Sequence, residues 1–326
     1  MCFIIQLPMQ IKMRRGESML VPNEQNERMI TYEVEAEDDQ QPLKETLKNR
    51  LDLSSRLLTK LKKSKRILIN GQYAKYHELL SEGDWIKIDM TEEASQFEPQ
   101  EIPFNVVYED IDVIVINKEP GIVSHPTKSH PKDTIANAAQ NYLEKKGVAC
   151  RIRFVNRLDM DTSGLLVIAK NPYTHHIMSQ QMKANEITKK YVAFVKGVVV
   201  ANEGEIDGAI YRSSDETIKR VVDDRGQQSL TKFTVLERYA DATMLEVSLL
   251  TGRTHQIRVH MESIGHPMLG DHLYGYVDTE LIRRQALHAS YLSFLQPRYK
   301  EKIEVRASLP KDLNELRNKL KDELLR

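Results

Sequence analysis

Residues 154–170 read FVNRLDMDTSGLLVIAK, and this stretch decides the fold prediction. A Thr-Ser-Gly turn leads directly into the apolar run LLVIA, a pattern typical of a buried strand. Asp159 precedes the turn, between Leu158 and Met160. A carboxylate beside the densest hydrophobic run of the chain either pairs with a cation or takes part in chemistry, because an unpaired buried charge is costly.

Length and composition indicate a cytoplasmic protein of about two domains. The chain has 326 residues, of which 40% are hydrophobic, enough to bury full cores. No apolar stretch approaches the roughly 20 residues that cross a bilayer. The basic residues of MCFIIQLPMQIKMRRGESM follow its apolar stretch, which is the wrong order for a secretory signal. Cys2 and Cys150 are too few for a disulfide framework or a cysteine-based zinc site.

The charges are segregated along the chain, although 47 basic and 47 acidic residues balance overall. Residues 43–66 carry nine Lys or Arg against two acidic residues, whereas residues 89–112 carry eight Asp or Glu and no Lys or Arg. Such a local basic patch lets a neutral protein bind phosphates, but a solvated helix face gives the same composition. Charge alone does not separate these two interpretations.

The basic segment has the pattern of a helix pair followed by a small hairpin. Leucines recur at helical spacing through residues 43–61, broken by LDLSS, where Ser54 is placed to cap a second helix. In ILINGQY a short strand leads into an Asn-Gly turn, and a Gly-Asp turn precedes the second strand, WIKIDM. This order resembles the S-four-type RNA-binding module over residues 29–91. The resemblance implies that three cations contact RNA phosphates: Arg56, Lys60 and Lys63.

The flanking segments have little pattern. We expect residues 1–28 to be disordered or extended, and a translation start at Met19 or Met29 is a further hypothesis. Residues 92–104 are acidic, contain two prolines and lack periodicity, so we predict a linker there.

Residues 105–326 have the pattern of an α+β domain with a mostly antiparallel mixed sheet. Strands outnumber helices and do not alternate with them regularly. We predict strands in VVYEDIDVIVINK, LLVIA, KKYVAFVKGVV, LTKFTVLERY and TMLEVSLLTG, and helices in TIANAAQNYLEKK and around HHIMSQQM. A loop-rich passage separates the third and fourth of these strands.

The stretch LLTGRTHQIRVHMESIGHPMLGD, residues 249–271, predicts a short helix. Thr254 is a plausible cap, Gly265 closes the helix, and Arg258 projects from its start. Four histidines invite a metal interpretation, which we reject because neither a His-x-x-x-His pair nor a carboxylate at ligand spacing is present. We interpret the histidines as polar packing and RNA-facing groups: His255, His260, His266 and His272.

Four segments together resemble the motifs of the RluA family of pseudouridine synthases, in order and spacing. They are NRLDMDTSGLLVIAK, GRTHQIRVHMESIGHPMLGD, NKEPGIVSHPT and ITKKYVAFVKG. The resemblance covers about residues 104–310. It implies that Asp159 is catalytic, that Arg258 pairs with it and that Tyr191 stacks on the target uracil. Arg157 would help to expel the target base from its stack or occupy its place.

The chemistry of pseudouridine formation agrees with these roles. The bond from C1′ to N1 breaks, the uracil rotates, and C1′ joins C5, which requires no metal and no redox cofactor. One carboxylate that acts as nucleophile or base is required, in a dry pocket that retains the detached base. A nearby guanidinium keeps such a carboxylate ionised and can pair with it bidentately.

Each assignment has an alternative. Asp159 could serve only in a structural ion pair or turn, Tyr191 could be a core residue, and Arg258 could pair with Glu262 four residues on. Asp161 has the same chemistry as Asp159, but it lies in the segment that favours a turn. One departure from the family is Asn156, where many members carry histidine; an asparagine can still make the hydrogen bonds that fix the loop.

These patterns predict an RNA pseudouridine synthase that acts on large-subunit ribosomal RNA. Transfer RNA is the alternative substrate. A non-catalytic RNA-binding protein is disfavoured because all three site residues are present, and a base-excising hydrolase because no paired carboxylate motif appears. We expect a monomer with no cofactor, no metal and no membrane partner.

Overall fold

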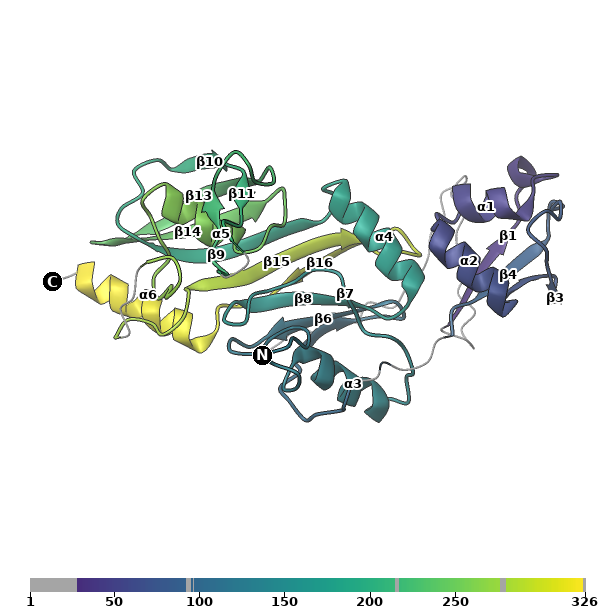
Figure 1. Cartoon of the computed structure of the whole chain (residues 1–326), viewed down its shortest axis with the longest axis horizontal. Coiled ribbons are helices and arrows are strands. Elements are labelled where there is room, and N and C mark those ends of the chain that lie inside the picture. The colour runs from purple at the N-terminus through teal and green to yellow at the C-terminus, as the bar shows by residue number, and fades with distance from the viewer. Residues whose placement is uncertain (1–27, 92–94, 96, 215–216, 276–279, 325–326) are drawn as a thin grey trace. The chain divides into compact units, whose positions relative to one another are not determined.

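The computed structural model describes residues 28–91, 95, 97–214, 217–275 and 280–324 (Figure 1). The chain divides into two compact units, Met1–Asp89 and Met90–Arg326. Residues 1–27, which cover nearly all of the segment predicted to be disordered or extended and the hypothetical start at Met19, lie outside the described residues. No helix in the described ranges is long and apolar enough to cross a membrane.

The first unit is a four-stranded antiparallel sheet accompanied by two helices. Its strand order is β1-β4-β2-β3. The elements are β1 (Met29–Glu33), η1 (Ala36–Asp38), α1 (Leu43–Asn49), α2 (Ser55–Ser64), β2 (Ile67–Ile69), β3 (Gln72–Tyr73) and β4 (Trp85–Asp89). The helix pair and the hairpin are as predicted, whereas β1 is absent from the sequence-based prediction.

Local sequence explains the start of α2 and the turn between β2 and β3. The Ser54 side chain accepts a hydrogen bond from the Leu57 N–H at 3.2 Å, which confirms the predicted cap of α2. Asn70 and Gly71 have φ values of 50° and 83°, the left-handed pair that a tight two-residue hairpin turn requires. Because the leucines of α2 are buried, its cations are left on the opposite, exposed face: Arg56, Lys60 and Lys63.

The second unit is built on a ten-stranded sheet with the path β10-β13-β14-β9-β15-β8-β6-β5, on which β16 pairs with β15 and β7 with β8. Among the described strands only β15 and β8 pair in parallel, so the predicted α+β class with a mostly antiparallel sheet is confirmed. The strands are β5 (Val106–Glu109), β6 (Val113–Lys118), β7 (Arg153–Phe154), β8 (Ser163–Ala169), β9 (Thr188–Lys196), β10 (Glu203–Asp207), β13 (Leu230–Arg238), β14 (Ala242–Leu249), β15 (Leu287–Leu295) and β16 (Lys302–Arg306).

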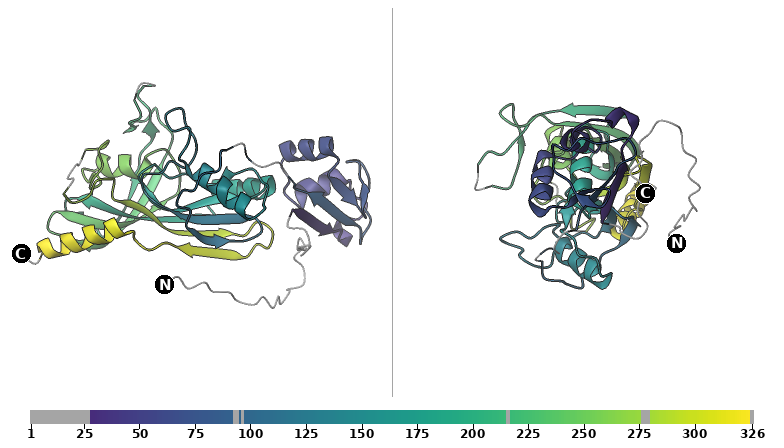
Figure 2. Two further views of the ribbon diagram at one scale, coloured as in Figure 1. Left: turned by 90° about the horizontal axis from the view of Figure 1, so that it is seen from below. Right: turned by 90° about the vertical axis from the view of Figure 1, so that its right-hand side faces the viewer.

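Four helices cover the two faces of this sheet. α3 (Ile135–Lys145) and α5 (Gln256–Ser263) pack with one face, and α4 (Pro172–Lys183) and α6 (Lys311–Leu324) with the other. Figure 2 shows α6, in yellow, as the last element of the chain. All seven residues of β8 are buried, because its side chains enter the core on both faces alternately. Because β8 lies between β15 and β6, the loop that carries Asp159 leads into the middle of the sheet.

The described part of the predicted linker forms neither helix nor strand, and it packs against the rest of the second unit. The Ser95 N–H donates to the Cys150 carbonyl at 3.3 Å, and the Asn137 side chain donates to the Glu98 carbonyl at 2.9 Å. Phe97 and Phe104 pack against the main core cluster. Side-chain burial therefore holds this acidic stretch in place.

His288 on β15 makes the stability of the fold depend on pH. Its side chain is fully buried, with Nδ1 2.9 Å from the Ser163 hydroxyl and Nε2 3.3 Å from the Ala307 carbonyl oxygen. Burial lowers its pKa from 6.5 to about 4. The unfolded chain therefore binds a proton that the folded protein does not, so stability falls as the pH drops from 6.5 toward 4.

We expect His288 to cost the protein about 2 kcal/mol of stability between pH 7 and pH 5. Urea unfolding measures the free energy of unfolding at pH 7 and pH 5, in the original protein and in His288→Gln. The loss of this free energy between the two pH values should be about 2 kcal/mol smaller in the variant. An unchanged pH dependence in the variant would contradict the assignment.

Candidate active site

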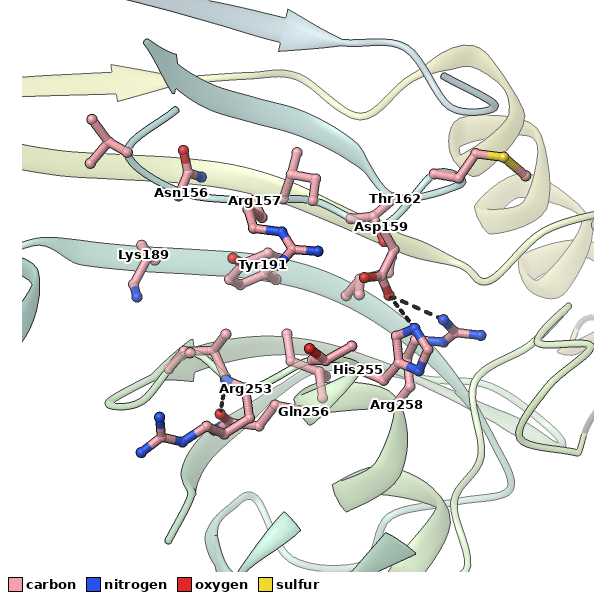
Figure 3. A pocket seen from close by; sticks show the side chains of 18 of the residues that line it. Asn156, Arg157, Asp159, Thr162, Lys189, Tyr191, Arg253, His255, Gln256 and Arg258 are labelled. Atoms are coloured by element: carbon pink, nitrogen blue, oxygen red, sulfur yellow. Dashed lines mark hydrogen bonds and ion pairs between the residues drawn. The ribbon is translucent and has the colours of Figure 1, made fainter. Parts of the chain in front are cut away.

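A pocket of about 440 Å³ lies where the loop before β8, the strand β9 and the start of α5 meet (Figure 3). Its lining includes the three predicted catalytic residues, Asp159, Tyr191 and Arg258, together with Arg157. These side chains are up to 99 residues apart in the chain and come together through the β9–β15–β8 pairing. The sequence motifs thus converge on one cavity.

Asp159 lies in a turn that the surrounding structure fixes from several sides. Its carbonyl accepts from the Thr162 N–H at 3.1 Å, and its side chain is 28% exposed toward the pocket. The Ser124 hydroxyl donates to the Leu158 carbonyl at 3.3 Å. The Arg284 guanidinium donates to the Asp161 carbonyl at 2.9 Å. Because the backbone on both sides is held, the direction of the Asp159 carboxylate is set before any substrate arrives.

Lys118 holds the same loop, a role that its unremarkable Lys-Glu-Pro-Gly turn does not reveal in the sequence. Its Nζ donates to the carbonyls of Glu119, Ile122 and Met160 at 2.8, 2.9 and 2.7 Å. Burial lowers its pKa to about 7, although Asp161 and Asp159 act in the opposite direction. The acceptor on Met160 ties the residue after Asp159 to the end of β6.

Arg258 pairs with two carboxylates at once. Its Nη1 donates to Asp159 Oδ2 at 3.1 Å, while Nε and Nη2 donate to the two oxygens of Asp271 at 2.7 and 2.8 Å. Asp271 is fully buried and also accepts the N–H groups of Leu273 and Tyr274. Burial alone would lower the pKa of Arg258, but Asp271 and Asp159 raise it above its ordinary value.

The alternative pairing of Arg258 with Glu262 is wrong, since Glu262 lies 3.9 Å from Lys219 instead. The predicted cap of α5 by Thr254 is also wrong. His255 occupies the N-cap position with φ 58°, and its side chain makes no cap hydrogen bond. The Gln256 side chain accepts the N–H of Arg253 at 3.0 Å. Gly265, with φ 83°, follows the end of the helix as predicted.

Tyr191 lies on the face of β9 that meets α5. It is 6% exposed and belongs to the main core cluster, and it also lines the pocket. Tyr191 is therefore both a core residue and a residue of the pocket wall. Burial, with the charge of Asp159 nearby, raises the pKa of its phenol above the ordinary value. The ring is therefore a neutral aromatic wall at physiological pH.

Arg157 and Asn156 precede Asp159 in different settings. Arg157 is exposed and lines the pocket. Asn156 accepts the Val167 N–H at 2.8 Å and donates to the Leu165 carbonyl at 3.1 Å, which fastens the loop to β8. The expectation that this asparagine makes loop-fixing hydrogen bonds is confirmed.

The four histidines near α5 have separate environments. His255 Nε2 lies 3.8 Å from Asp159 Oδ2, and its Nδ1 lies 3.0 Å from the Tyr274 hydroxyl. Burial lowers the pKa of His255 below its ordinary value, although Asp159 opposes this. His260, His266 and His272 hydrogen-bond to backbone carbonyls of Gly208, Lys196 and Arg283. Within the described ranges no group of three or more His, Cys, Asp or Glu side chains has metal-binding geometry.

Two cations of the pocket wall were not predicted from the sequence. Lys189 lines the pocket, and burial lowers its pKa; among the described residues no carboxylate forms an ion pair with it. Arg253 lies at the pocket's edge, with its guanidinium 3.4 Å from the Gln228 carbonyl. Lys189 stands two residues before Tyr191. Because side chains alternate between the two faces of a strand, this spacing could have predicted from the sequence that both side chains lie on the same face.

Comparison with known proteins identifies the family. The model for RNA pseudouridylate synthase matches residues 112–263, and the model for the RluD ribosomal pseudouridine synthase N-terminal domain matches residues 30–86. The uncharacterized RNA pseudouridine synthase YjbO of Bacillus subtilis is 40% identical over 269 residues, which are 82% of this chain and 95% of the relative. The chain belongs to the RluA family of RNA pseudouridine synthases.

Two further relatives place the chain within this family. Ribosomal large subunit pseudouridine synthase D of Yersinia pestis is 38% identical over 271 residues, 78% of this chain and 83% of the relative. The solved structure of human RNA pseudouridylate synthase domain containing 1 is 30% identical and gives a TM-score of 0.53. It covers 66% of this chain and 87% of the human one. This RluA-family enzyme is therefore an isomerase that acts on RNA.

Proposed function

We propose that this RluA-family enzyme converts uridines of large-subunit ribosomal RNA to pseudouridine. The similarity to ribosomal large subunit pseudouridine synthase D supports this substrate class, as does the RluD-type N-terminal domain. In this proposal the module of residues 29–91 contacts RNA phosphates through Arg56, Lys60 and Lys63, which its α2 presents on an exposed face. The unit of residues 105–326 performs the chemistry.

The observation that carries the mechanism is the chain of contacts from Asp271 through Arg258 to Asp159. The buried Asp271 fixes the guanidinium, and the guanidinium in turn pairs with the Asp159 carboxylate at the pocket. Asp159 acts as nucleophile or base while the bond from C1′ to N1 breaks. When C1′ joins C5, the C5 proton leaves and N1 gains a proton, so the product is an isomer of the substrate.

Tyr191 and Arg157 position the base in this mechanism. The aromatic face of Tyr191 stacks on the flipped uracil and limits its movement while it is detached. Arg157, exposed at the pocket, takes the place that the target base leaves in the RNA. Leu158, Ile257 and Leu287 of the main hydrophobic cluster line the pocket, and in this mechanism they limit the contact of the detached base with water.

A tritium-release assay tests the substrate class. RNA from a strain that lacks this gene is labelled at uridine C5, separated into ribosomal and transfer RNA, and incubated with the purified enzyme. Isomerisation releases the label to water, and we expect release from large-subunit ribosomal RNA and none from transfer RNA. Release from transfer RNA alone would contradict the proposed substrate but would leave the family activity intact.

A further inference from the structure

The imidazole of His255 faces the same oxygen of Asp159 as the Arg258 guanidinium does (Figure 3). Nη1 of Arg258 lies 3.1 Å from Asp159 Oδ2, and Nε2 of His255 lies 3.8 Å from it. Among the described residues, no hydrogen bond or ion pair reaches the second oxygen, Oδ1. Both contacts therefore converge on one oxygen of the carboxylate and leave the other without a protein partner.

The second ring nitrogen of His255 contacts the hydroxyl of Tyr274. Nδ1 lies 3.0 Å from that hydroxyl, which also accepts the Arg220 N–H at 2.8 Å. Arg220 directly precedes the short strand β12 (Val221–Val222), which pairs with β11 (Ile210–Tyr211). Tyr274 is 1% exposed, and burial raises the pKa of its phenol to about 12, so the hydroxyl keeps its proton at physiological pH.

These contacts assign the tautomer of His255. In the part of the chain that the structure describes, the Tyr274 hydroxyl has one hydrogen-bond acceptor, which is Nδ1 of His255. A buried hydroxyl proton without an acceptor costs about 1–3 kcal/mol, so the hydroxyl donates to Nδ1. A neutral imidazole that accepts at Nδ1 carries its proton on Nε2. The N–H group of the ring is therefore the one that faces Asp159.

The ring of His255 is neutral in this arrangement. Protonation would place an N–H at Nδ1, where the Tyr274 hydroxyl already directs its own proton. Burial lowers the pKa of the ring, and the surrounding charges act in both directions. Two carboxylates raise this pKa and two guanidinium groups lower it: Asp159, Asp271, Arg258 and Arg220. A neutral N–H orients a carboxylate without giving it a proton.

We propose that His255 is a positioning residue, whose Nε2–H acts with Arg258 to hold one oxygen of Asp159 so that the other oxygen reacts at the target nucleoside. This rests on the proposed function, in which Asp159 is the nucleophile or base. A carboxylate held by one donor can turn about its Cβ–Cγ bond, and a second donor from another side chain opposes this turn. The 3.8 Å distance is longer than a direct hydrogen bond, as catalytic contacts often are before substrate binds.

The test compares two amide substitutions of His255 in the full-length enzyme. The amide nitrogen of glutamine is as many bonds from Cα as Nε2 of the ring, and that of asparagine as many as Nδ1. We expect His255→Asn to lower the single-turnover rate by about tenfold or more, and His255→Gln to recover most of this loss. The dissociation constant for RNA should change by about twofold or less in both variants. The substrate is total RNA, labelled with tritium at uridine C5, from a strain that lacks this gene.

Two controls exclude a general effect of the substitutions. His255 has φ 58°, a conformation that asparagine adopts more readily than glutamine, so backbone strain would give the opposite order of rates. The thermal unfolding midpoint of each variant reports folding. His266→Asn is the matched histidine substitution, because His266 Nδ1 lies 2.9 Å from the Lys196 carbonyl oxygen and His266 is not among the described residues that line the pocket. We expect this variant to keep its rate within about twofold.

Nitrogen NMR of the enzyme labelled in its histidine rings tests the tautomer directly. The signals that disappear in His255→Asn belong to His255. At pH 7 we expect a protonated Nε2 and an unprotonated Nδ1, and we expect Tyr274→Phe, which removes the hydroxyl donor, to shift the Nδ1 signal. A proton on Nδ1 in the original protein would overturn the proposal, whatever the variants do.

The kinetic outcomes are equally decisive. An unchanged rate in His255→Asn would overturn the proposal. Equal losses in the asparagine and glutamine variants would also overturn it, because they would show that the ring and not its Nε2–H is required. Tritium release from transfer RNA alone would refute the proposed ribosomal substrate, and full activity of Asp159→Asn would refute the role of Asp159. The comparison on total RNA separates both of these failures from a failure of the role of His255.

Discussion

Replacing Asp159 with asparagine is expected to lower the rate of pseudouridine formation by at least about a thousandfold. The amide can act neither as the nucleophile nor as the base at C1′, although it fills the same space. Arg258 keeps its two bonds to Asp271, so the variant should fold like the original protein. Single-turnover rates at saturating RNA, with the thermal unfolding midpoint as the folding control, measure the effect.

Asp161→Asn is the matched control for this prediction. Asp161 is two residues from Asp159 and lines a different cavity, with Pro120 and Arg284. Its backbone carbonyl, which the substitution leaves in place, is the group that accepts from Arg284. We expect Asp161→Asn to retain activity within about tenfold. A large loss in Asp161→Asn with none in Asp159→Asn would show that the assignment of the carboxylate is wrong.

The second large effect is expected from Asp271→Asn. Asp271 is fully buried and accepts two hydrogen bonds from Arg258, so the substitution leaves a buried guanidinium with only one carboxylate partner. Removal of one partner from a buried ion pair costs about 3–5 kcal/mol of stability. Because Arg258 also loses its fixed orientation toward Asp159, we expect the rate to fall by about 100-fold. Urea unfolding and single-turnover kinetics measure the two effects separately.

Asp312→Asn provides the comparison for Asp271→Asn. Asp312 also accepts two bonds from an arginine, at 2.6 and 3.1 Å from Arg284, but its side chain is 40% exposed. Water can replace the lost interaction there, so we expect a loss of about 1 kcal/mol or less. Equal losses of stability in the two variants would contradict the claim that burial makes the Asp271–Arg258 pair important.

The sequence predicted those parts of the structure that local pattern encodes. The residue patterns of β9 and β8 predicted strands, and the Ser54 cap and the Asn70-Gly71 turn were visible as residue types. The convergence of Asp159, Tyr191 and Arg258 on one pocket followed from the family motifs taken together. No single motif contains the contacts that join these residues.

Other parts depend on contacts between distant residues. Lys118 resembles any lysine before a turn, and only the fold brings it to the Met160 carbonyl 42 residues away. Asp271 and Arg284 carry no local sign that they hold Arg258 and the Asp159 loop. The left-handed conformation of His255, with φ 58°, likewise has no local signal in the sequence, and His255 rather than Thr254 occupies the N-cap position of α5.

One missed element did have a signal in the sequence. Leu313, Leu316 and Leu320 recur at helical spacing, and all three are buried in α6 against β9 and β14. The strands β10, β11 and β12 lie in the passage predicted to be loop-rich. The last two have only two residues each, too short for a period to be recognised.

The most direct test of the central claim is to map pseudouridines at nucleotide resolution. Total RNA and pre-ribosomal particles from a strain lacking this gene are incubated with the enzyme or with Asp159→Asn. We predict new pseudouridines at defined positions of large-subunit ribosomal RNA, made by the unmodified enzyme alone. The same sites made by Asp159→Asn, or no new site with either protein on either substrate, would contradict the claim that the Asp159 carboxylate drives this isomerisation.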